Sequence, residues 1–398
     1  MKPRWIHLLG ALVLLSVLTP PAGAQNDVDI GGIVDLVGTG QQELDWLNSN
    51  NTGDGNFDPL RARLFVDGRR DNTALFMQFL FSGESFSEMR LFGAYLLHKV
   101  FEGESLYLEA GLIPSHNGIW AANTYSDKNP LVGIPLSYYW KSTLPYRQMP
   151  NNLDDLLAHR GQGQTGINYA DSSGVRGTAF RPSMPVLYDN CWNYGFYTMG
   201  AKGLFNYALG ITAGTPSAPV ASTNINDNIT VNGRLGYVVS PGLQLWVSGA
   251  HGAYLGREVQ PYLPPGKTVN DYMQTLFGLS ADWKWSHLAV MGEVFYNKYD
   301  TPLRADGLRN GSGYVQGVYT VYPQWDISLR YDGLVFESVQ NSAGDWLTWD
   351  QDIHRYEAGV MYRVTRDLRV KAVVQDTNTG DGFSSQNLIP ALQVAFRF

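Results

Sequence analysis

The chain has 398 residues, of which 13% are aromatic and 16% are charged, and its formal net charge is −7. This acidic balance argues against a nucleic-acid partner, which would require a basic face. The single cysteine, Cys191, excludes an intrachain disulfide framework. Abundant aromatic residues and glycines, distributed over short alternating segments, are typical of all-β proteins.

Residues 1–24 have the pattern of a cleaved secretory signal peptide. Lys2 and Arg4 supply positive charge, an apolar stretch follows, and Ala22-Gly23-Ala24 provides small residues for cleavage. The apolar stretch is too short to span a bilayer as a helix. We therefore expect export, with a mature chain that begins at Gln25. No later stretch is long and apolar enough to predict a transmembrane helix.

Alternating segments that we interpret as strands begin directly after this peptide. In residues 60–67 the even positions are apolar and three of the four odd positions are charged. Successive side chains of a strand point to opposite faces, so this pattern predicts one apolar and one polar face. The first predicted strands are 28–37, 60–67, 73–81, 89–99 and 105–113.

A very long irregular stretch, residues 114–190, interrupts this pattern and is rich in Pro and Asn. The alternation then resumes and continues to the C-terminus. The remaining predicted strands are 191–201, 204–213, 228–239, 243–252, 274–284, 287–296, 312–322, 326–336, 354–364, 368–376 and 387–398.

The connections between these segments alternate between short and long. Lys202-Gly203 and Trp285-Ser286 are short, whereas 253–273, 297–311 and 337–353 are long. A β-sandwich gives no reason for this alternation, but an outer-membrane barrel has tight turns on one side of the membrane and long loops on the other. We predict sixteen strands, with both termini on the short-turn side, and a barrel closed because lipid does not satisfy open strand edges.

The predicted strands place charges on the face opposite the apolar one. Ile327 and Leu329 alternate with Ser328 and Arg330, for example. A dry core would not tolerate so many inward charges. A water-filled lumen would, so the pattern favours a transmembrane antiparallel up-and-down β-barrel.

The last strand ends on alternating apolar residues, Leu392, Val394, Phe396 and Phe398. Together with the signal peptide, the strand number and the long third loop, this ending resembles bacterial outer-membrane porins. Residues 109–114, 207–214 and 233–237 are similar to segments of the porin superfamily that includes the phosphate-selective porins. The chain lacks the coiled-coil N-terminus and the lysine-rich interior of those members, so phosphate specificity does not follow.

The resemblance implies a channel in the bacterial outer membrane for passive diffusion of small hydrophilic solutes or ions. It further implies contact with membrane lipids and lipopolysaccharide, a homotrimer, and assembly by the barrel assembly machinery, which reads the terminal aromatic residue. The loop 114–190 would fold into the barrel and narrow it; an extracellular cap is the alternative. No cofactor, metal or nucleic acid is expected, because the sequence shows no His or acidic ligand cluster.

Inward-facing charges are the candidate site residues. Arginines from the first and last strands become neighbours when the barrel closes, which predicts a weak preference for anions; structural pairing of each Arg with an acid is the alternative. We also keep an outer-membrane hydrolase and a plugged structural barrel as alternative functions, although no nucleophile motif supports an enzyme. The predicted pore-lining residues are Arg61, Arg63, Arg330, Arg355, Arg363, Arg369, Lys371, Arg397, Glu109 and Glu357, and the predicted acidic lip on the loop is Asp127, Asp154 and Asp155.

Overall fold

The structure is a computed structural model of the whole chain. The signal peptide, Cys191 and most of the loop 38–59 lie outside the described residues. The described residues are 27–39, 47, 60–82, 88–101, 105–171, 174–177, 183–188, 192–219, 226, 228–380 and 388–398.

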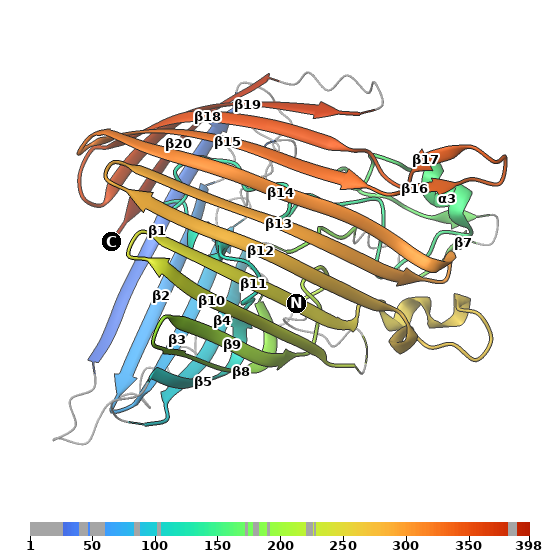
Figure 1. The fold of residues 1–398 in the computed structure, drawn as a ribbon, viewed down its shortest axis with the longest axis horizontal. Coiled ribbons are helices and arrows are strands. Elements are labelled where there is room, and N and C mark those ends of the chain that lie inside the picture. Colours follow the sequence, from blue (N-terminus) through green and yellow to red (C-terminus); the bar gives the residue numbers. More distant parts are fainter. Residues whose placement is uncertain are drawn as a thin grey trace, which may run out of the picture.

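Sixteen antiparallel strands close into one barrel, as the alternation predicted (Figure 1). Each strand pairs with its neighbours along the chain, and β1 pairs with β20 to complete the ring. The strands are β1 Asp27–Thr39, β2 Leu60–Arg70, β3 Thr73–Ser82, β4 Glu88–Lys99, β5 Ser105–Pro114, β8 Trp192–Lys202, β9 Phe205–Thr212, β10 Thr230–Ser240, β11 Leu243–Ala253, β12 Met273–Trp285, β13 Leu288–Thr301, β14 Arg304–Tyr322, β15 Trp325–Phe336, β18 Ile353–Arg363, β19 Leu368–Thr379 and β20 Leu388–Arg397.

The seam between the first and last strands depends on Gly32 and the C-terminal residue. The Gly32 amide donates to the Phe398 carbonyl at 2.9 Å, and the Phe398 amide donates to the Gly32 carbonyl at 3.0 Å. A side chain at residue 32 would clash with the Phe398 ring and with the Arg63 carbonyl. Glycine therefore lets the terminal aromatic lie across the seam.

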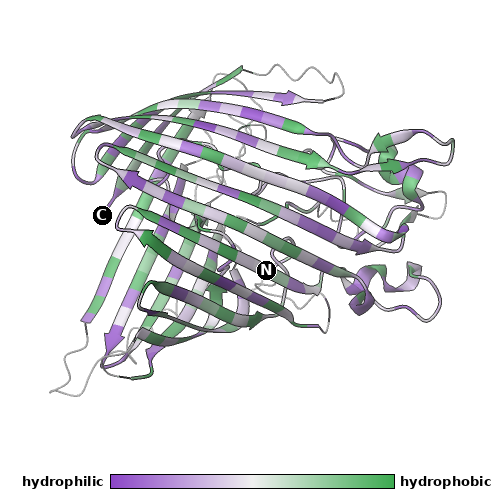
Figure 2. Ribbon diagram, in the orientation of Figure 1, coloured by the Kyte–Doolittle hydropathy of each residue, from purple (hydrophilic) through white to green (hydrophobic). Residues whose placement is uncertain are grey.

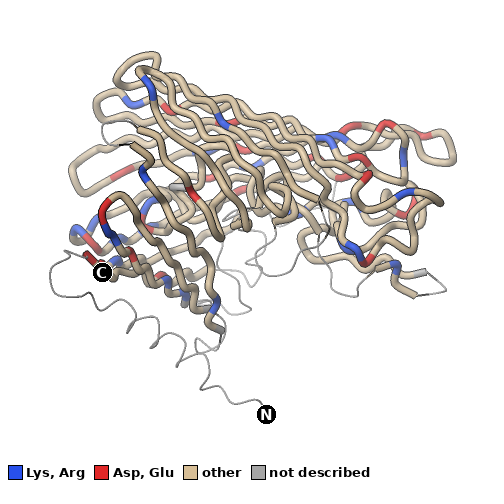
Figure 3. The backbone as a smooth tube through the Cα atoms, turned by 90° about the horizontal axis from the view of Figure 1, so that it is seen from below, with Lys and Arg blue, Asp and Glu red and all other residues tan. Residues whose placement is uncertain are grey.

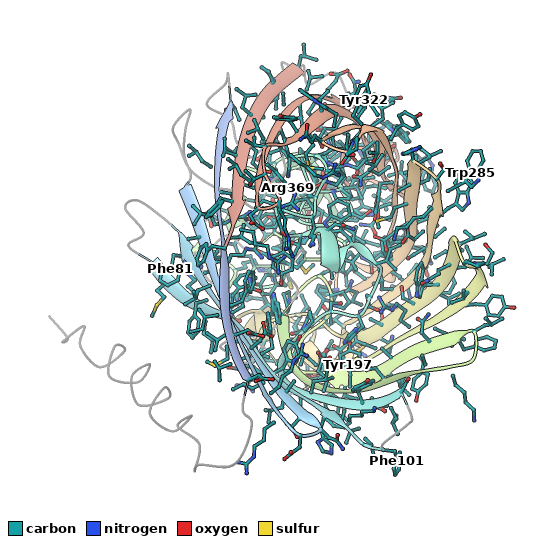
Figure 4. The ribbon with its side chains drawn as sticks, turned by 90° about the vertical axis from the view of Figure 1, so that its left-hand side faces the viewer. Phe81, Phe101, Tyr197, Trp285, Tyr322 and Arg369 are labelled. Carbon is teal, nitrogen blue, oxygen red and sulfur yellow. The ribbon has the colours of Figure 1, made fainter. Side chains whose placement is uncertain are left out.

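The two faces of the barrel wall differ as the alternation requires. Leu329 is 61% exposed and Leu392 is 59% exposed on the outer face, whereas Gln393, the next residue, is 3% exposed. Figure 2 shows hydrophobic and hydrophilic residues alternating along the strands. Figure 3 shows long uncharged stretches of strand between charged residues near the two ends of the barrel. Trp285 and Tyr322 point away from the barrel at its short-turn end (Figure 4), where aromatic girdles are expected.

The connection 297–311, which we predicted as a long loop, is instead mostly strand. β13 continues to Thr301 and β14 begins at Arg304, so a tight turn at residues 302–303 joins two long strands. In this hairpin Tyr299 and Leu308 are buried in the apolar cluster of the lumen, whereas the other face carries charged residues such as Lys298 and Asp300. The alternation of apolar residues that revealed the other strands is therefore weaker there.

The other long connections contain short elements. A two-stranded hairpin, β16 Ser338–Gln340 and β17 Trp346–Thr348, lies between β15 and β18, and the 3-10 helices η3 Arg257–Tyr262 and η4 Val269–Asp271 lie between β11 and β12. None of the helices in the described part of the chain is long and apolar enough to cross a membrane.

Candidate functional site: a loop held inside the barrel

The connection between β5 and β8, residues 115–191, is the longest in the chain and is called the β5–β8 loop below. It contains η2 Trp120–Asn123, the helix α3 Leu153–Ala158, and the short strands β6 Ala170–Asp171 and β7 Gly174–Val175. The Asn117 side-chain Nδ2 donates to the Asn232 side-chain oxygen on β10 at 3.0 Å. The Tyr125 hydroxyl donates to the Gln78 side-chain oxygen on β3 at 3.0 Å. These contacts with inward-facing residues on different parts of the wall place the described start of the loop inside the lumen.

Four buried charges on β15 and β18 form a network beside this loop, called the clamp here: Arg330, Asp332, Arg355 and Glu357. The register places Arg330 opposite Glu357 and Asp332 opposite Arg355, so opposite charges face each other across the strands. Asp332 lies 3.1 Å from the Arg330 Nε and 3.2 Å from the Arg355 Nε, and Arg330 also pairs with Glu357. All four side chains are fully buried, where charges require both partners and further hydrogen bonds.

The clamp obtains those further hydrogen bonds from the backbone of the β5–β8 loop. The amides of Val132 and Gly133 donate to Glu357 at 3.2 and 2.8 Å. The Leu136 amide donates to Asp332 at 3.1 Å, and Arg355 donates to the Ile134 carbonyl. The loop backbone thus supplies hydrogen-bond partners for the clamp charges. The clamp in turn fixes residues 132–136 against this side of the lumen.

Lys371 on β19 holds the preceding part of the loop in the same way. Its Nζ donates to the carbonyls of Ser126 and Leu131 at 2.6 and 3.1 Å, and to the Gln393 side chain at 2.7 Å. The Ser126 hydroxyl donates to Asp35 at 2.8 Å. Charged groups from the first and the fifteenth strand of the barrel therefore meet on one loop segment.

Glu293 on β13 is a further anchor, which the sequence analysis did not identify. Its carboxylate accepts from the Ile119 amide at 2.6 Å and from the hydroxyls of Tyr138 and Tyr314, each at 2.8 Å. The Ser280 hydroxyl also donates to it, at 2.9 Å. A lone acid at an inward position in the middle of an apolar strand was the available signal.

A buried apolar cluster joins the loop to the inner wall. Trp120, Leu144 and Leu187 of the loop pack in one buried cluster with the inward-facing Phe295 and Tyr299 of the wall. Such packing stabilises the loop in one position, because interiors of this kind are packed as densely as organic crystals.

The predicted pore-lining residues divide into two groups. Five of the eight basic ones are buried: Arg330 and Arg355 in the clamp, Lys371 under the loop, Arg61 and Arg63 on β2. Arg61 pairs with Asp35 at 3.1 Å, and the Arg63 guanidinium lies 5.1 Å from the Tyr125 ring centroid. Among the acids, Glu357 belongs to the clamp, and Glu109 on β5 contacts the His116 Nε2 at 2.8 Å. A direct role of these buried groups in lining a pore stays a prediction.

The second group lies at the short-turn end and remains accessible. Arg363, Arg369 and Arg397 stand on the neighbouring strands β18, β19 and β20, and Figure 4 shows Arg369 within the ring of strands. The side chains of Arg363 and Arg397 are 31% and 49% exposed. Pairing of consecutive strands places these arginines next to one another, and their role in the pore stays a prediction.

The residues of the predicted acidic lip lie at opposite ends of the barrel. Asp127 faces the arginines, and its Oδ2 lies 2.8 Å from the Arg397 Nη1. Asp154 and Asp155 instead belong to α3, beside β16 and β17 at the opposite end of the barrel (Figure 1). The Ser342 amide donates to Asp154 at 3.0 Å, and these hydrogen bonds from Ser342 lower the pKa of Asp154. Asp154 and Asp155 therefore do not face these arginines, and Asp127 is the acid of the predicted lip that meets them.

The described residues contain no group of three or more His, Cys, Asp or Glu side chains arranged to hold a metal ion.

Comparisons with solved structures agree with this architecture. The outer-membrane channel DcaP of Acinetobacter baumannii matches with 12% identity and a TM-score of 0.50, over 94% of this chain and 97% of that chain. OmpF of Salmonella typhi, solved in complex with daunomycin, matches with 11% identity and a TM-score of 0.55, over 94% and 98%. No protein-family model and no curated protein matches the sequence. The chain has the fold of bacterial outer-membrane porins.

Proposed function

We propose that the protein is a porin of the bacterial outer membrane, through which small hydrophilic solutes or ions diffuse passively. The observation that carries this proposal is the closed sixteen-stranded barrel with charged side chains on its inner wall. Barrels of sixteen to eighteen strands enclose an aqueous channel, whereas eight-stranded barrels are filled by their own side chains. The short-turn end then faces the periplasm and the long loops face outwards.

In this proposal the β5–β8 loop is the constriction of the channel. Its anchors on β13, β15, β18 and β19 hold it against one side of the lumen. The clamp charges position the loop, and the accessible arginines at the periplasmic mouth act on passing ions. We infer a weak preference for anions, because Arg369 at this mouth forms no salt bridge in the described part of the chain, whereas Arg363 and Arg397 pair with Asp326 and Asp127.

The same proposal includes the surroundings of the barrel. The signal peptide directs export, the barrel assembly machinery inserts the chain, and membrane lipids and lipopolysaccharide surround it. Several apolar grooves lie on the outer face of the barrel. The groove at the seam between β1 and β20 has a volume of about 470 Å³ and is lined by Leu36, Gly38, Leu392 and Val394, among others. The apolar lining of this seam groove supports contact with further copies of the chain, as in a homotrimer.

One observation favours a second candidate function. A buried apolar cluster of loop and wall residues occupies part of the lumen. A barrel that is filled throughout would be a structural protein without a conducting path.

Swelling of proteoliposomes distinguishes the two candidates. Vesicles with the folded protein are diluted into isotonic arabinose, glucose, sucrose or raffinose, and light scattering reports swelling. The porin proposal expects swelling that slows with sugar size, because the loop narrows the lumen. Vesicles that swell no faster than protein-free vesicles in any of these sugars support the plugged barrel. Heat-modifiable migration on gels is the control for correct folding.

A further inference from the structure

We propose that Arg369 and its two arginine neighbours, Arg363 and Arg397, form a binding site for a small oxyanion at the periplasmic mouth. The proposed ligand class is a carboxylate or phosphate group, and Arg369 is its principal donor. The inference rests on the proposed channel only for the side from which the anion arrives.

The barrel register places the first two arginines side by side. Arg363 and Arg369 are directly opposite each other on β18 and β19. Like charges at such a position destabilise a sheet unless an opposite charge compensates them. Arg397 stands on β20, the next strand, opposite Ile33 of β1. Arg369 itself stands opposite Ala395, two residues before Arg397, so the three arginines lie on neighbouring strands at one end of the barrel.

The two outer arginines have protein partners. Arg363 pairs with Asp326 and donates to the Pro323 carbonyl at 2.9 Å. Arg397 pairs with Asp127 at 2.8 Å. These partners orient the two side chains and neutralise much of their charge, so neither is the strongest candidate to bind an external anion.

Arg369 differs from both neighbours. Within the described part of the chain it forms no salt bridge, and its Nη1 is buried without a hydrogen-bond partner. The residue as a whole is partly exposed. A buried charged donor without a hydrogen-bond partner costs free energy. An oxyanion that bridges Arg369 to its neighbours would supply the missing acceptor.

The surrounding charges favour an anion at this position. Lys371, two residues further along β19, adds positive charge from beneath the loop. Asp29 and Asp67 lie across the seam on β1 and β2. The charges that act on Asp67 are those of Arg69, Asp29 and Arg397, and Arg369 is not among them.

The chemistry of guanidinium selects oxyanions over halides. Its planar fork donates two parallel hydrogen bonds to two oxygens of a carboxylate or phosphate. Chloride has a single centre and gains less from this geometry. A partly dehydrated mouth strengthens the attraction, because charges interact more strongly there than in bulk water.

Block of chloride current by phosphate tests the proposal. Purified protein is inserted into planar bilayers with one orientation, and inorganic phosphate or acetate is added to either side at constant ionic strength. We expect phosphate on the periplasmic side to reduce the chloride current at lower concentrations than phosphate on the other side. Arg369→Gln should raise the half-blocking concentration about tenfold, the expected cost of losing a charged hydrogen bond.

Two variants separate this site from general electrostatics. Arg366→Gln removes the same charge from the exposed periplasmic turn, three residues away, and should leave the block unchanged. Arg369→Lys keeps the charge but loses the fork, so it should retain only part of the phosphate effect. Equal block of wild type and Arg369→Gln, or an equal loss in Arg366→Gln, would overturn the proposal.

A direct binding measurement does not depend on conduction. The thermal unfolding midpoint of the detergent-solubilised protein is recorded with phosphate and with chloride at matched ionic strength. Phosphate should raise the midpoint of the wild type above that in chloride, because a bound ligand stabilises the folded state, but not that of Arg369→Gln. A barrel that binds phosphate through Arg369 but passes no current would refute the channel and leave this site standing. Identical shifts in both proteins, or no shift in either, would refute the site.

Discussion

Arg397 of the closing strand lies 2.8 Å from Asp127 of the β5–β8 loop, measured from Nη1 to Oδ2. This ion pair joins the last strand of the barrel to a loop 270 positions earlier in the chain. The neighbouring Ser126 contacts β1 through Asp35 and β19 through Lys371. The loop segment 126–127 thus bridges the seam at which the barrel closes, so closure and loop position depend on each other.

The clamp should make a large contribution to stability. Arg355→Met removes a fully buried partner of Asp332 and the hydrogen bond to the Ile134 carbonyl. Loss of one member of a buried ion pair costs about 3–5 kcal/mol. Urea unfolding in lipid vesicles measures this, with Arg366→Met in the exposed turn as the control, expected within about 0.5 kcal/mol of wild type. Equal free energies of unfolding for Arg355→Met and wild type would show that the clamp does not hold the loop.

Glu293 should fix the start of the loop through its negative charge. Glu293→Gln keeps the size of the side chain but places an NH₂ group among four donors. We expect faster amide hydrogen exchange at residues 118–120, because the Ile119 amide loses a charged acceptor. Asp282→Asn is the matched control, since Asp282 lies on the neighbouring strand β12 and pairs with Lys284 near the turn. Unchanged exchange in Glu293→Gln would mean that packing alone holds the segment.

Asp350 should make stability depend on pH. Asp350 lies in the connection between β17 and β18. Its carboxylate accepts hydrogen bonds from the backbone amides of Thr143 at 2.6 Å and Gly161 at 2.7 Å. Burial raises its pKa above the ordinary value of 3.8. The folded protein therefore binds this proton more tightly than the unfolded chain. Its stabilising contribution is complete below the ordinary pKa and is lost as pH rises through the raised pKa.

The variant Asp350→Asn removes this titration and retains an acceptor oxygen. The difference in free energy of unfolding between wild type and variant should change with pH between 3.8 and the raised pKa of Asp350. Above the raised pKa this difference should be constant. A difference that is independent of pH throughout would show that Asp350 has the same pKa in both states.

Deletion of Phe398 should impair closure of the barrel. The deletion removes both hydrogen bonds to Gly32 and the aromatic ring that covers this glycine. We expect less heat-modifiable protein in the outer membrane and more protease-sensitive chain in the periplasm. Trp285→Ala, which removes an exposed aromatic side chain at a turn away from the seam, should assemble normally. Normal assembly after deletion of Phe398 would contradict its role at the seam.

The strands were predictable because lipid on one side and polar groups on the other impose a strict period of two. Ile327 and Leu329 on the outer face, with Ser328 and Arg330 on the inner face, follow it without exception. The hairpin at residues 302–303 escaped prediction because one face of its strands carries charged residues such as Lys298 and Asp300 in place of apolar ones.

The partners of the inward charges were harder to predict. Which acid pairs with Arg330 or Arg355 depends on strand register, and the hydrogen bonds from Gly133 and Leu136 depend on the path of an irregular loop. Asp154 and Asp155 show the same limit: the sequence places them in the loop, but helix α3 and the contact with Ser342 decide at which end of the barrel they lie.

Single-channel recording in planar bilayers tests the central claim, that the loop narrows a conducting barrel, most directly. Purified, heat-modifiable protein should give stepwise currents that increase linearly with voltage, and Arg355→Met should give noisier steps because its loop is held less firmly. Membranes that contain folded wild-type protein and show no steps above the baseline would contradict the account.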